Sequence, residues 1–478
     1  MPRARLLLTL LPLFILSSAR AESGRQTFNL EELLELAERN YPGLEARLHE
    51  VEAAEARLDE ARISPYMQIR ATGNFAVVPE ASGTPLYSNE TQLNLHGRWG
   101  PTVGASVEAA IPIVTFGKLP ALRELGRVGV RSSKIEYERT LAKVKEDIVR
   151  AYLALQLALD LRVMLDEGLG YLAQARSVLE SREASLEAGA QAGAQAGTQA
   201  GGDPMDTYRI DAVASELAAR AAEISLLEEG ARAALETLAG VERFEIEDCP
   251  ISPFELPPGE ERSLAPQAGI EEAIERRPER RLLAEARIAR ESELRLHRGK
   301  FYPDLLLVAR AGAQLTPGRT DISNPYISDA PNIRVLGAAL ALRWELDFYG
   351  TYKRMMRGRA LLQALDAQTR EAEGGMRLEL REARARLEAA REKVRAFGMG
   401  ERSTRGWTVA ALQGYQIGTT EARTLIEALK AYYTQRGSRL QAIYELNSAI
   451  THYLRVSASG EPPRGGWNSS CLMDEGFE

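Results

Sequence analysis

The sequence predicts a mainly helical, internally duplicated chain that carries a small β component of four two-faced strands. Its composition is the first reason. The 478 residues are 27% charged and only 6% aromatic, and they are rich in Ala, Leu, Glu and Arg, which is typical of long helices. The second reason is that one order of elements occurs twice. In each copy, two alternating segments interrupt the helical composition, and this predicts paired strands.

Residues 1–21, MPRARLLLTLLPLFILSSARA, have the pattern of a secretory signal: a basic start, an apolar run and an A-x-A cleavage site. The mature chain is therefore expected to begin near Glu22. Loss of three arginines would change the net charge from −7 to −10. The apolar run is too short to span a bilayer, so a mature chain without a membrane helix is expected.

Two repeats and a Pro-rich linker account for the mature chain. Each repeat is expected to contain two short helices, two strands and a long helical hairpin. Asn29 and Glu32 form a capping-box pattern at the start of the first helix. The expected bounds are 22–240 for the first repeat (strands at about 66–78 and 102–114, hairpin at 118–240), 241–269 for the equatorial linker, 270–456 for the second repeat (strands at about 304–316 and 333–347, hairpin at 351–456) and 457–478 for a C-terminal tail.

Each strand alternates between apolar and polar side chains, which is the pattern of a sheet with one apolar and one polar face. The polar set is Gln68, Arg70, Thr72, Asn74, Arg310 and Gln314. The apolar set includes Ile69, Leu305, Leu307, Leu340, Leu342 and Trp344, and Arg334 and Arg343 are placed opposite the apolar face of the fourth strand.

Four strands cannot close a barrel, whereas three chains would supply twelve strands and leave no edge. The sequence therefore predicts a trimer with a 12-stranded β-barrel. The polar residues would line a wet lumen and the apolar residues would face lipid. A soluble β-layer packed on helices is the alternative.

The helical hairpins are expected to be far longer than a compact domain needs. No proline occurs from Ala121 to Asp203 or from Asn332 to Glu461. Apolar residues from Leu141 to Ala158 and from Met376 to Phe397 recur at alternating steps of three and four, which is the spacing of coiled coils. Sixty-five helical residues would extend about 100 Å at ~1.5 Å each.

These features resemble the TolC family of outer-membrane efflux channel proteins. The resemblance covers about Phe28 to Val456. It is carried by the duplicated element order, the segment AERNYPGLEA, the corners TFGK and FYGT, and the turn YQIGT at 415–419. It implies a homotrimeric exit duct in the outer membrane with a periplasmic α-helical coiled-coil barrel. Such a duct serves a tripartite efflux or type I secretion system, together with a periplasmic adaptor protein and an inner-membrane pump. The resemblance implies neither an enzyme nor a cofactor.

The resemblance also assigns roles at the hairpin tips. It implies adaptor docking at Gly189, Ile417, Gly418 and Thr419, and closure of the entrance by Asp206, Tyr415 and Glu427. Two positions depart from the family pattern. Thr424 occupies the place of a first acidic ring, and Thr420 that of an arginine, so cation blocking and the closing lock are expected to be weaker. For the acidic residues, a solvated helix face is the alternative.

The segment AGAQAGAQAGTQAGG is about 11 residues longer than the family turn at this place. Its glycines, 189, 193, 197 and 201, recur every four residues. Because each glycine costs about 1 kcal/mol in a helix, a loop at the tip is the simpler interpretation. A continued helix, with glycines that permit close approach of adaptor helices, is the other.

The sequence lacks the motifs that are typical of several other classes of protein. The negative net charge argues against nucleic-acid binding, and the four histidines are isolated, so no metal site is expected. No phosphate-binding loop or nucleophile motif indicates an enzyme. Pairing of Cys249 with Cys471 is left open. A periplasmic adaptor and a coiled-coil envelope scaffold are the competing functions, although an adaptor would need only one hairpin and no lipid-facing strands.

Overall fold

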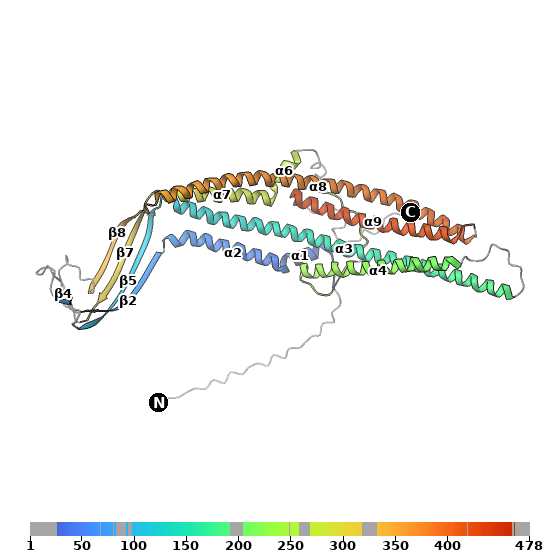
Figure 1. The fold of residues 1–478 in the computed structure, drawn as a ribbon, viewed down its shortest axis with the longest axis horizontal. Coiled ribbons are helices and arrows are strands. Elements are labelled where there is room, and N and C mark those ends of the chain that lie inside the picture. The colour runs from blue at the N-terminus through green and yellow to red at the C-terminus, as the bar shows by residue number, and fades with distance from the viewer. Residues whose placement is uncertain are drawn as a thin grey trace, which may run out of the picture.

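The computed structural model is elongated, with a sheet at one end and long helices that run away from it (Figure 1). It describes residues 26–66, 68–79, 81–82, 92–93, 98–191, 204–247, 249–257, 268–317, 332–417, 419–460 and 463. The expected signal segment 1–21 and most of the C-terminal tail lie outside these residues. Within the described part of the chain, no helix combines the length and the apolar character needed to cross a membrane.

The element order repeats as expected. The first copy contains β1 (Gln26–Phe28), α1 (Leu30–Asn40), α2 (Pro42–Ile63), β2 (Gln68–Pro79), β3 (Ala81–Ser82), β4 (Gln92–Leu93), β5 (Trp99–Val114), α3 (Lys118–Gln191) and α4 (Pro204–Ala239). After β6 (Phe244–Ile246), the second copy contains α6 (Ala268–Arg276), α7 (Pro278–Gly299), β7 (Asp304–Leu315), β8 (Ile333–Arg343), α8 (Phe348–Gln416) and α9 (Ala422–Ser457).

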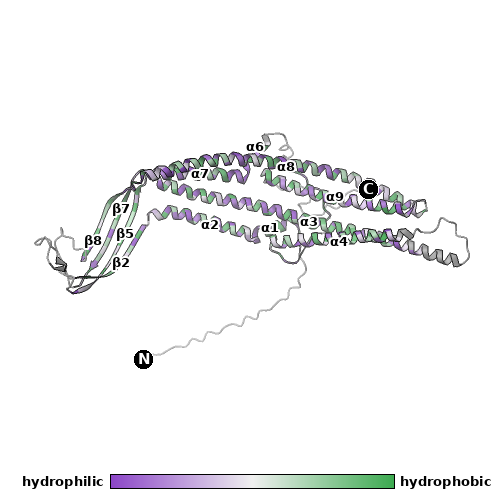
Figure 2. Cartoon of the chain, viewed as in Figure 1, coloured by the Kyte–Doolittle hydropathy of each residue, from purple (hydrophilic) through white to green (hydrophobic). Residues whose placement is uncertain are grey.

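The four long strands form one antiparallel sheet in the order β2-β5-β7-β8. The register places Arg70 beside Glu108, and Glu108 beside Arg310, so these three side chains share one face. All six residues of the predicted polar set have this parity. Ile69, Leu305, Leu307, Leu340 and Leu342 have the opposite parity. The division into two faces is therefore a property of the folded sheet, and Figure 2 shows the alternation along the strands.

Two expectations about β8 are wrong. The strand ends at Arg343, opposite Asp304, and not near residue 347. The partner strand β7 begins at Asp304 and cannot begin earlier, because Pro303 has no N–H to donate to a neighbouring strand. Trp344 therefore lies beyond the end of β8. Arg334 pairs with Ala313, on the apolar face, whereas Arg343 lies opposite that face as expected.

The two corners between sheet and long helix differ. In the first, Phe116 and Gly117 have φ values of 46° and 86°, a left-handed conformation that glycine adopts without strain. In the second, α8 begins at Phe348, because the Asp347 side chain accepts a hydrogen bond from the Gly350 N–H at 3.0 Å. The FYGT segment is therefore a capped helix start and not a separate turn.

The long helices, α3 and α8, have 74 and 69 residues and extend about 110 and 100 Å at ~1.5 Å per residue. Near the sheet they pack with α2 and α7, and farther away with α4 and α9 (Figure 1). The heptad spacing is confirmed by burial. Ile148, Leu155 and Leu387 are fully buried at helix contacts. The capping box of α1 also forms, with Glu32 N–H donating to Asn29 and Asn29 N–H to Glu32.

A waist between the two helical halves contains the largest apolar core. Here β1 pairs in parallel with β6, and Phe28 packs near Phe244. Residues 249–257 of the linker after β6 are held against α9, where the fully buried Asn447 accepts from Phe254 N–H and donates to the Ser252 carbonyl. In this linker Cys249 is disulfide-bonded. Cys471, the chain's other cysteine, lies outside the described residues.

Candidate functional site

The apolar face of the sheet is exposed in the single chain. Leu336 and Leu340 are 90% and 67% exposed on β8, and Ile69 and Phe75 are exposed on β2. Water-soluble chains rarely leave contiguous apolar surface of this extent uncovered. Strands of 11 to 16 residues are also as long as, or longer than, tilted strands that cross a bilayer.

Aromatic side chains cluster where the sheet meets the helices. Phe116 stacks on Tyr302 at 5.3 Å between ring centroids, and Trp344 meets Phe348 edge-on at 5.8 Å. All four are exposed, and exposed Trp99 lies at the far end of the sheet. Aromatic residues at both margins of an apolar band are typical of membrane–water interfaces. Trp344 therefore belongs to this junction and not to the strand surface.

The opposite face of the sheet is polar. Across its middle, Arg70, Glu108 and Arg310 form a row of alternating charge. Nearer the far end, Thr102 accepts a hydrogen bond from Thr316, and Gln314 donates to Thr102. A face of this kind is suited to contact with water.

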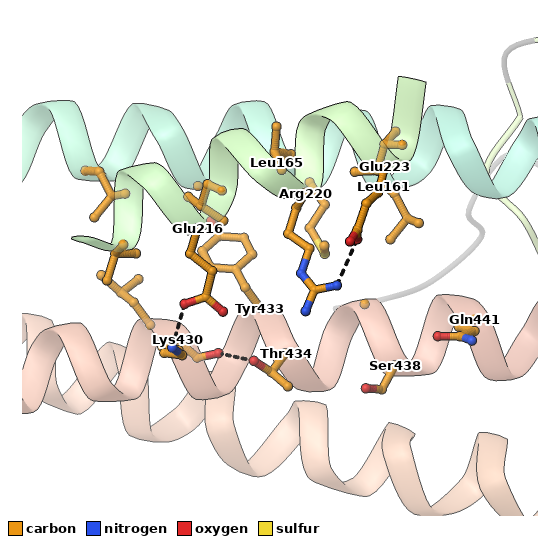
Figure 3. Close-up of a pocket in the computed structure, with 18 of the residues that line it drawn as sticks. Leu161, Leu165, Glu216, Arg220, Glu223, Lys430, Tyr433, Thr434, Ser438 and Gln441 are labelled. Atoms are coloured by element: carbon orange, nitrogen blue, oxygen red, sulfur yellow. Dashed lines mark hydrogen bonds and ion pairs between the residues drawn. The ribbon is translucent and has the colours of Figure 1, made fainter. Parts of the chain in front are cut away.

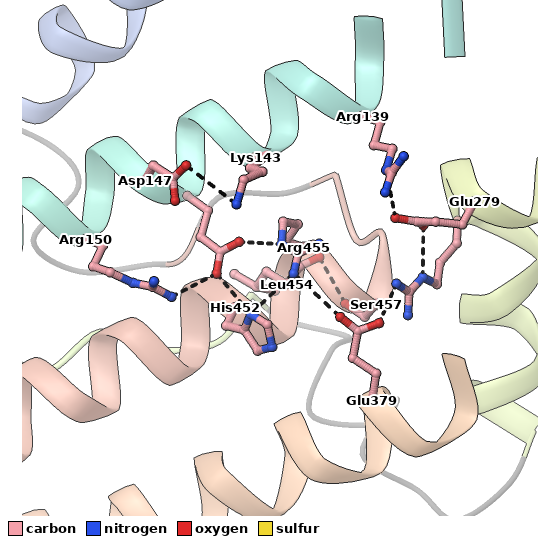
Figure 4. Close-up of polar contacts among 12 residues, drawn as sticks. Arg139, Lys143, Asp147, Arg150, Glu279, Glu379, His452, Leu454, Arg455 and Ser457 are labelled. Atoms are coloured by element: carbon pink, nitrogen blue, oxygen red, sulfur yellow. Dashed lines mark hydrogen bonds and ion pairs between the residues drawn. The ribbon is translucent and has the colours of Figure 1, made fainter. Parts of the chain in front are cut away.

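A charged network ties the two repeats together at the waist (Figure 4). At its centre is Glu146 of α3, whose side chain is 8% exposed. It accepts from His452 Nδ1 at 2.9 Å and from Arg455, both on α9, and from Arg150 at 3.2 Å. Burial raises the pKa of Glu146, but the hydrogen bond from His452 and the charge of Arg455 outweigh it and hold the pKa at about 2. Glu146 is therefore a buried carboxylate.

The network continues into α7 and α8. Arg455 lies 3.7 Å from Glu379, which in turn accepts from the buried Arg277 at 2.6 Å. Arg277 also donates to Glu279 at 3.2 Å, and Arg139 of α3 lies 3.4 Å from Glu279. Four helices thus meet through a chain of charge pairs, which ties the hairpins together where they leave the waist.

The tip of the α8–α9 hairpin is organised by Gly414. Its carbonyl accepts from Thr419 N–H at 2.8 Å, Thr420 N–H at 3.1 Å and the Thr419 hydroxyl at 3.1 Å. A Cβ on Gly414 would clash with the Thr420 hydroxyl. An alanine at 414 would therefore force the Thr420 side chain to move, and the local sequence does not reveal this because the contact is made across the turn.

The predicted tip residues fall into three groups. Tyr415 packs against the small core of Ala411, Leu425 and Ala428 inside the hairpin, whereas Ile417 is 76% exposed. Glu427 is exposed and pairs with Arg423 at 2.9 Å on the same helix. Gly189 lies within α3 and Asp206 within α4, but the structure describes only their helical backbone. Gly418 lies outside the described residues.

The structure describes the first hairpin on both sides of residues 192–203. α3 continues to Gln191 and α4 begins at Pro204, so Gly189 is helical. The other three glycines of the repeat lie outside the described residues. Elsewhere in the described chain, no group of three or more His, Cys, Asp or Glu side chains is arranged to hold a metal ion.

Replacement of Gly414 by alanine is expected to displace Thr419 and Thr420 and to loosen the tip turn, because the new methyl group occupies the space of the Thr420 hydroxyl. Limited proteolysis of the purified full chain should then cleave at the tip at least about tenfold faster. Gly406→Ala in the same helix is the control, since its Cβ would meet nothing within 4 Å. Equal cleavage of the two variants would contradict this account of the turn.

Comparison with known proteins is consistent with this geometry. The outer membrane efflux protein model matches residues 269–452, which is nearly all of the second repeat. A comparison with curated proteins finds no match. Among solved structures, the chain is similar to the outer-membrane channel OprN at 18% identity, with TM-score 0.68 over 90% of this chain and 89% of that one. It is also similar to the Neisseria gonorrhoeae MtrE outer membrane channel at 16% identity, with TM-score 0.65 over 93% of this chain and 91% of that one. The Campylobacter jejuni CmeC outer membrane channel is similar at 16% identity, with TM-score 0.68 over 96% of this chain and 94% of that one.

Proposed function

We propose that three copies of the chain form an exit duct through the outer membrane, as the match of the second repeat, residues 269–452, to the outer membrane efflux protein family suggests. The family match bears out the resemblance drawn from the sequence. One observation carries the proposal: a sheet with an exposed apolar face, aromatic margins and a polar opposite face, continued by helices about 100 Å long.

The trimer is supported by the edges of the sheet. Within the described chain, β2 pairs only with β5 and β8 only with β7, so each has one side without a partner. Three copies joined through these edges give twelve strands and a closed barrel. In that barrel, Ile69, Leu305, Leu307, Leu340 and Leu342 face lipid, whereas Gln68, Arg70, Thr72, Asn74, Arg310 and Gln314 line the lumen.

The partners follow from the same resemblance. A periplasmic adaptor protein and an inner-membrane pump would load the duct, and Ile417, Gly418, Thr419 and Gly189 at the tips would contact the adaptor. The strong exposure of Ile417 supports this assignment. Asp206, Tyr415 and Glu427 would narrow the entrance. The duct itself is a passive conduit, and an adaptor or scaffold function would leave the two-faced sheet without a role.

Conductance in planar bilayers tests the proposal. The row Arg70–Glu108–Arg310 carries one net positive charge per chain, so the open channel should favour anions. Arg310→Glu would give a net of −1 per chain and is expected to shift the reversal potential toward cation selectivity. Arg334→Glu, the same change on the apolar face, should leave selectivity within the error of the measurement.

Two results would contradict the assignment. A purified, folded chain that never conducts would argue for the scaffold or the adaptor. A shift caused by Arg334→Glu and not by Arg310→Glu would mean that the two faces of the sheet are assigned the wrong way round.

A further inference from the structure

We propose that a groove in the helical wall, between α3, α4 and α9, binds a small uncharged amphipathic molecule. The groove has a volume of about 590 Å³. Sites for drug-sized ligands commonly measure about 300–1,000 Å³. All three helices belong to one chain.

The floor of the groove is apolar. It is lined by Leu161, Met164 and Leu165 of α3 and by Leu217 and Ile224 of α4. Leu165 and Ile224 also pack together in a small core of their own, which makes the floor a fixed surface. An aliphatic or aromatic body of a ligand would be removed from water here, at about 25 cal/mol for each Å² buried.

The charges at the rim are already paired. Arg220 donates to Glu223 at 2.9 Å, and Lys430 donates to Glu216 at 2.7 Å across the mouth of the groove (Figure 3). These four are the charged residues among those that line it, and they sum to zero. A ligand with a net charge would have to break one of these pairs or leave its own charge unpaired, so the groove favours an uncharged one.

Polar groups without charge follow one side of the groove along α9. Tyr433, Ser438 and Gln441 line the groove there, and the Tyr433 ring points toward α4 in Figure 3. Burial, together with the nearby Glu167 carboxylate, raises the pKa of Tyr433 to about 12, so its phenol stays protonated at neutral pH. A hydroxyl or carbonyl group at one end of the ligand would find its hydrogen-bond partners in this row. An apolar body with one polar end is the resulting ligand class.

Gly168 offers a direct test, because it is buried beside the groove on α3. A Cβ at this position would lie 3.8 Å from both Leu217 and the Tyr433 ring, an ordinary contact distance. Alanine therefore fits, whereas the longer side chain of leucine would occupy the groove. Both changes raise helix propensity by up to about 1 kcal/mol relative to glycine, so neither should impair folding. Gly170→Leu, two residues along on the exposed side, is the matched control, since its Cβ meets nothing within 4 Å.

The probe is dodecanol that carries a photoreactive diazirine, applied to the full chain in lipid nanodiscs. Labelled peptides are then quantified by mass spectrometry. We expect saturable labelling of α3, α4 and α9 around the groove, and competition by excess dodecanol. Gly168→Leu should lower the labelling at least about tenfold, whereas Gly168→Ala and Gly170→Leu should stay within about twofold of the unmodified chain. Dodecanoate and dodecylammonium should each compete at least about tenfold less well than dodecanol.

Labelling that does not saturate, or that Gly168→Leu leaves unchanged, would overturn the site. Equal loss in Gly168→Leu and Gly170→Leu would show that the effect is not local and would also overturn it. Equal competition by either charged analogue would overturn the ligand class. The labelling does not require conduction, so failure of the channel proposal and failure of this one are separable.

Discussion

An arginine in place of Leu340 is expected to prevent the chain from accumulating in the outer membrane. Leu340 is 67% exposed on the apolar face of β8, opposite Leu307. An arginine on the lipid face of a barrel costs about 2–4 kcal/mol near the bilayer midplane, and a trimer would carry three copies. The side chain cannot turn inward, because adjacent strand residues point to opposite faces.

Ala339→Arg supplies the matched control. Ala339 is the preceding residue on the same strand and pairs with Val308 on the polar face. The same added charge should therefore be tolerated, because it would project into water. Outer-membrane fractions blotted for the protein should show at least a tenfold loss for Leu340→Arg and less than a twofold loss for Ala339→Arg. Normal amounts of the Leu340 variant would contradict the assignment of lipid to this face.

Loss of the Glu146 side chain is expected to be the most destabilising single change in the helical part. Glu146→Leu would leave the largely buried Arg455 and His452, and the half-exposed Arg150, without the carboxylate that they share. Removal of one partner from a buried charge network typically costs about 3–5 kcal/mol. The thermal unfolding midpoint of the detergent-solubilised protein should fall by about 5 °C or more.

The exposed ion pair of Glu392 and Arg395 provides a control for the change in unfolding midpoint. Glu392 and Arg395 lie 2.9 Å apart and are both about 70% exposed, so Glu392→Leu should change stability by less than about 0.5 kcal/mol. Midpoints that fall equally in the two variants would mean that the waist network has no special role.

The lowered pKa of Glu146 predicts that the stability of the folded chain depends on pH. The pKa of Glu146 is about 2 in the folded chain and near 4.5 when unperturbed. Because the pKa of Glu146 is lower in the folded chain, the ionised carboxylate contributes its full stabilisation above about pH 4.5. This contribution is lost as the pH falls toward 2. The midpoint difference between the natural chain and Glu146→Gln should therefore be smaller at pH 3 than at pH 5. A difference that grows on acidification would refute the assignment of the charge to Glu146.

Features that depend on local periodicity were predictable from the sequence. The Asn29 cap, the buried heptad residues and, apart from Arg334 and Trp344, the polar and apolar sets of the strands follow from spacings of two, three or four residues. The end of β8 was not predictable in this way, because it depends on where Pro303 stops the neighbouring strand.

The candidate site was predictable only in part. The tip turn was found, but the need for glycine at 414 depends on the approach of Thr420, six residues later. The waist network joins residues more than 300 positions apart, such as Glu146 and Arg455, and no local pattern connects them. The groove beside Gly168 likewise exists only because three helices from distant parts of the chain converge.

The most direct measurement of the central claim is negative-stain imaging of the detergent-purified full chain. A trimeric duct should give three-fold end views and particles far longer than wide, since α3 alone extends about 110 Å at ~1.5 Å per residue. Monomeric particles, or rings without three-fold symmetry, would contradict the trimeric duct and leave the exposed face of the sheet to be covered in some other way.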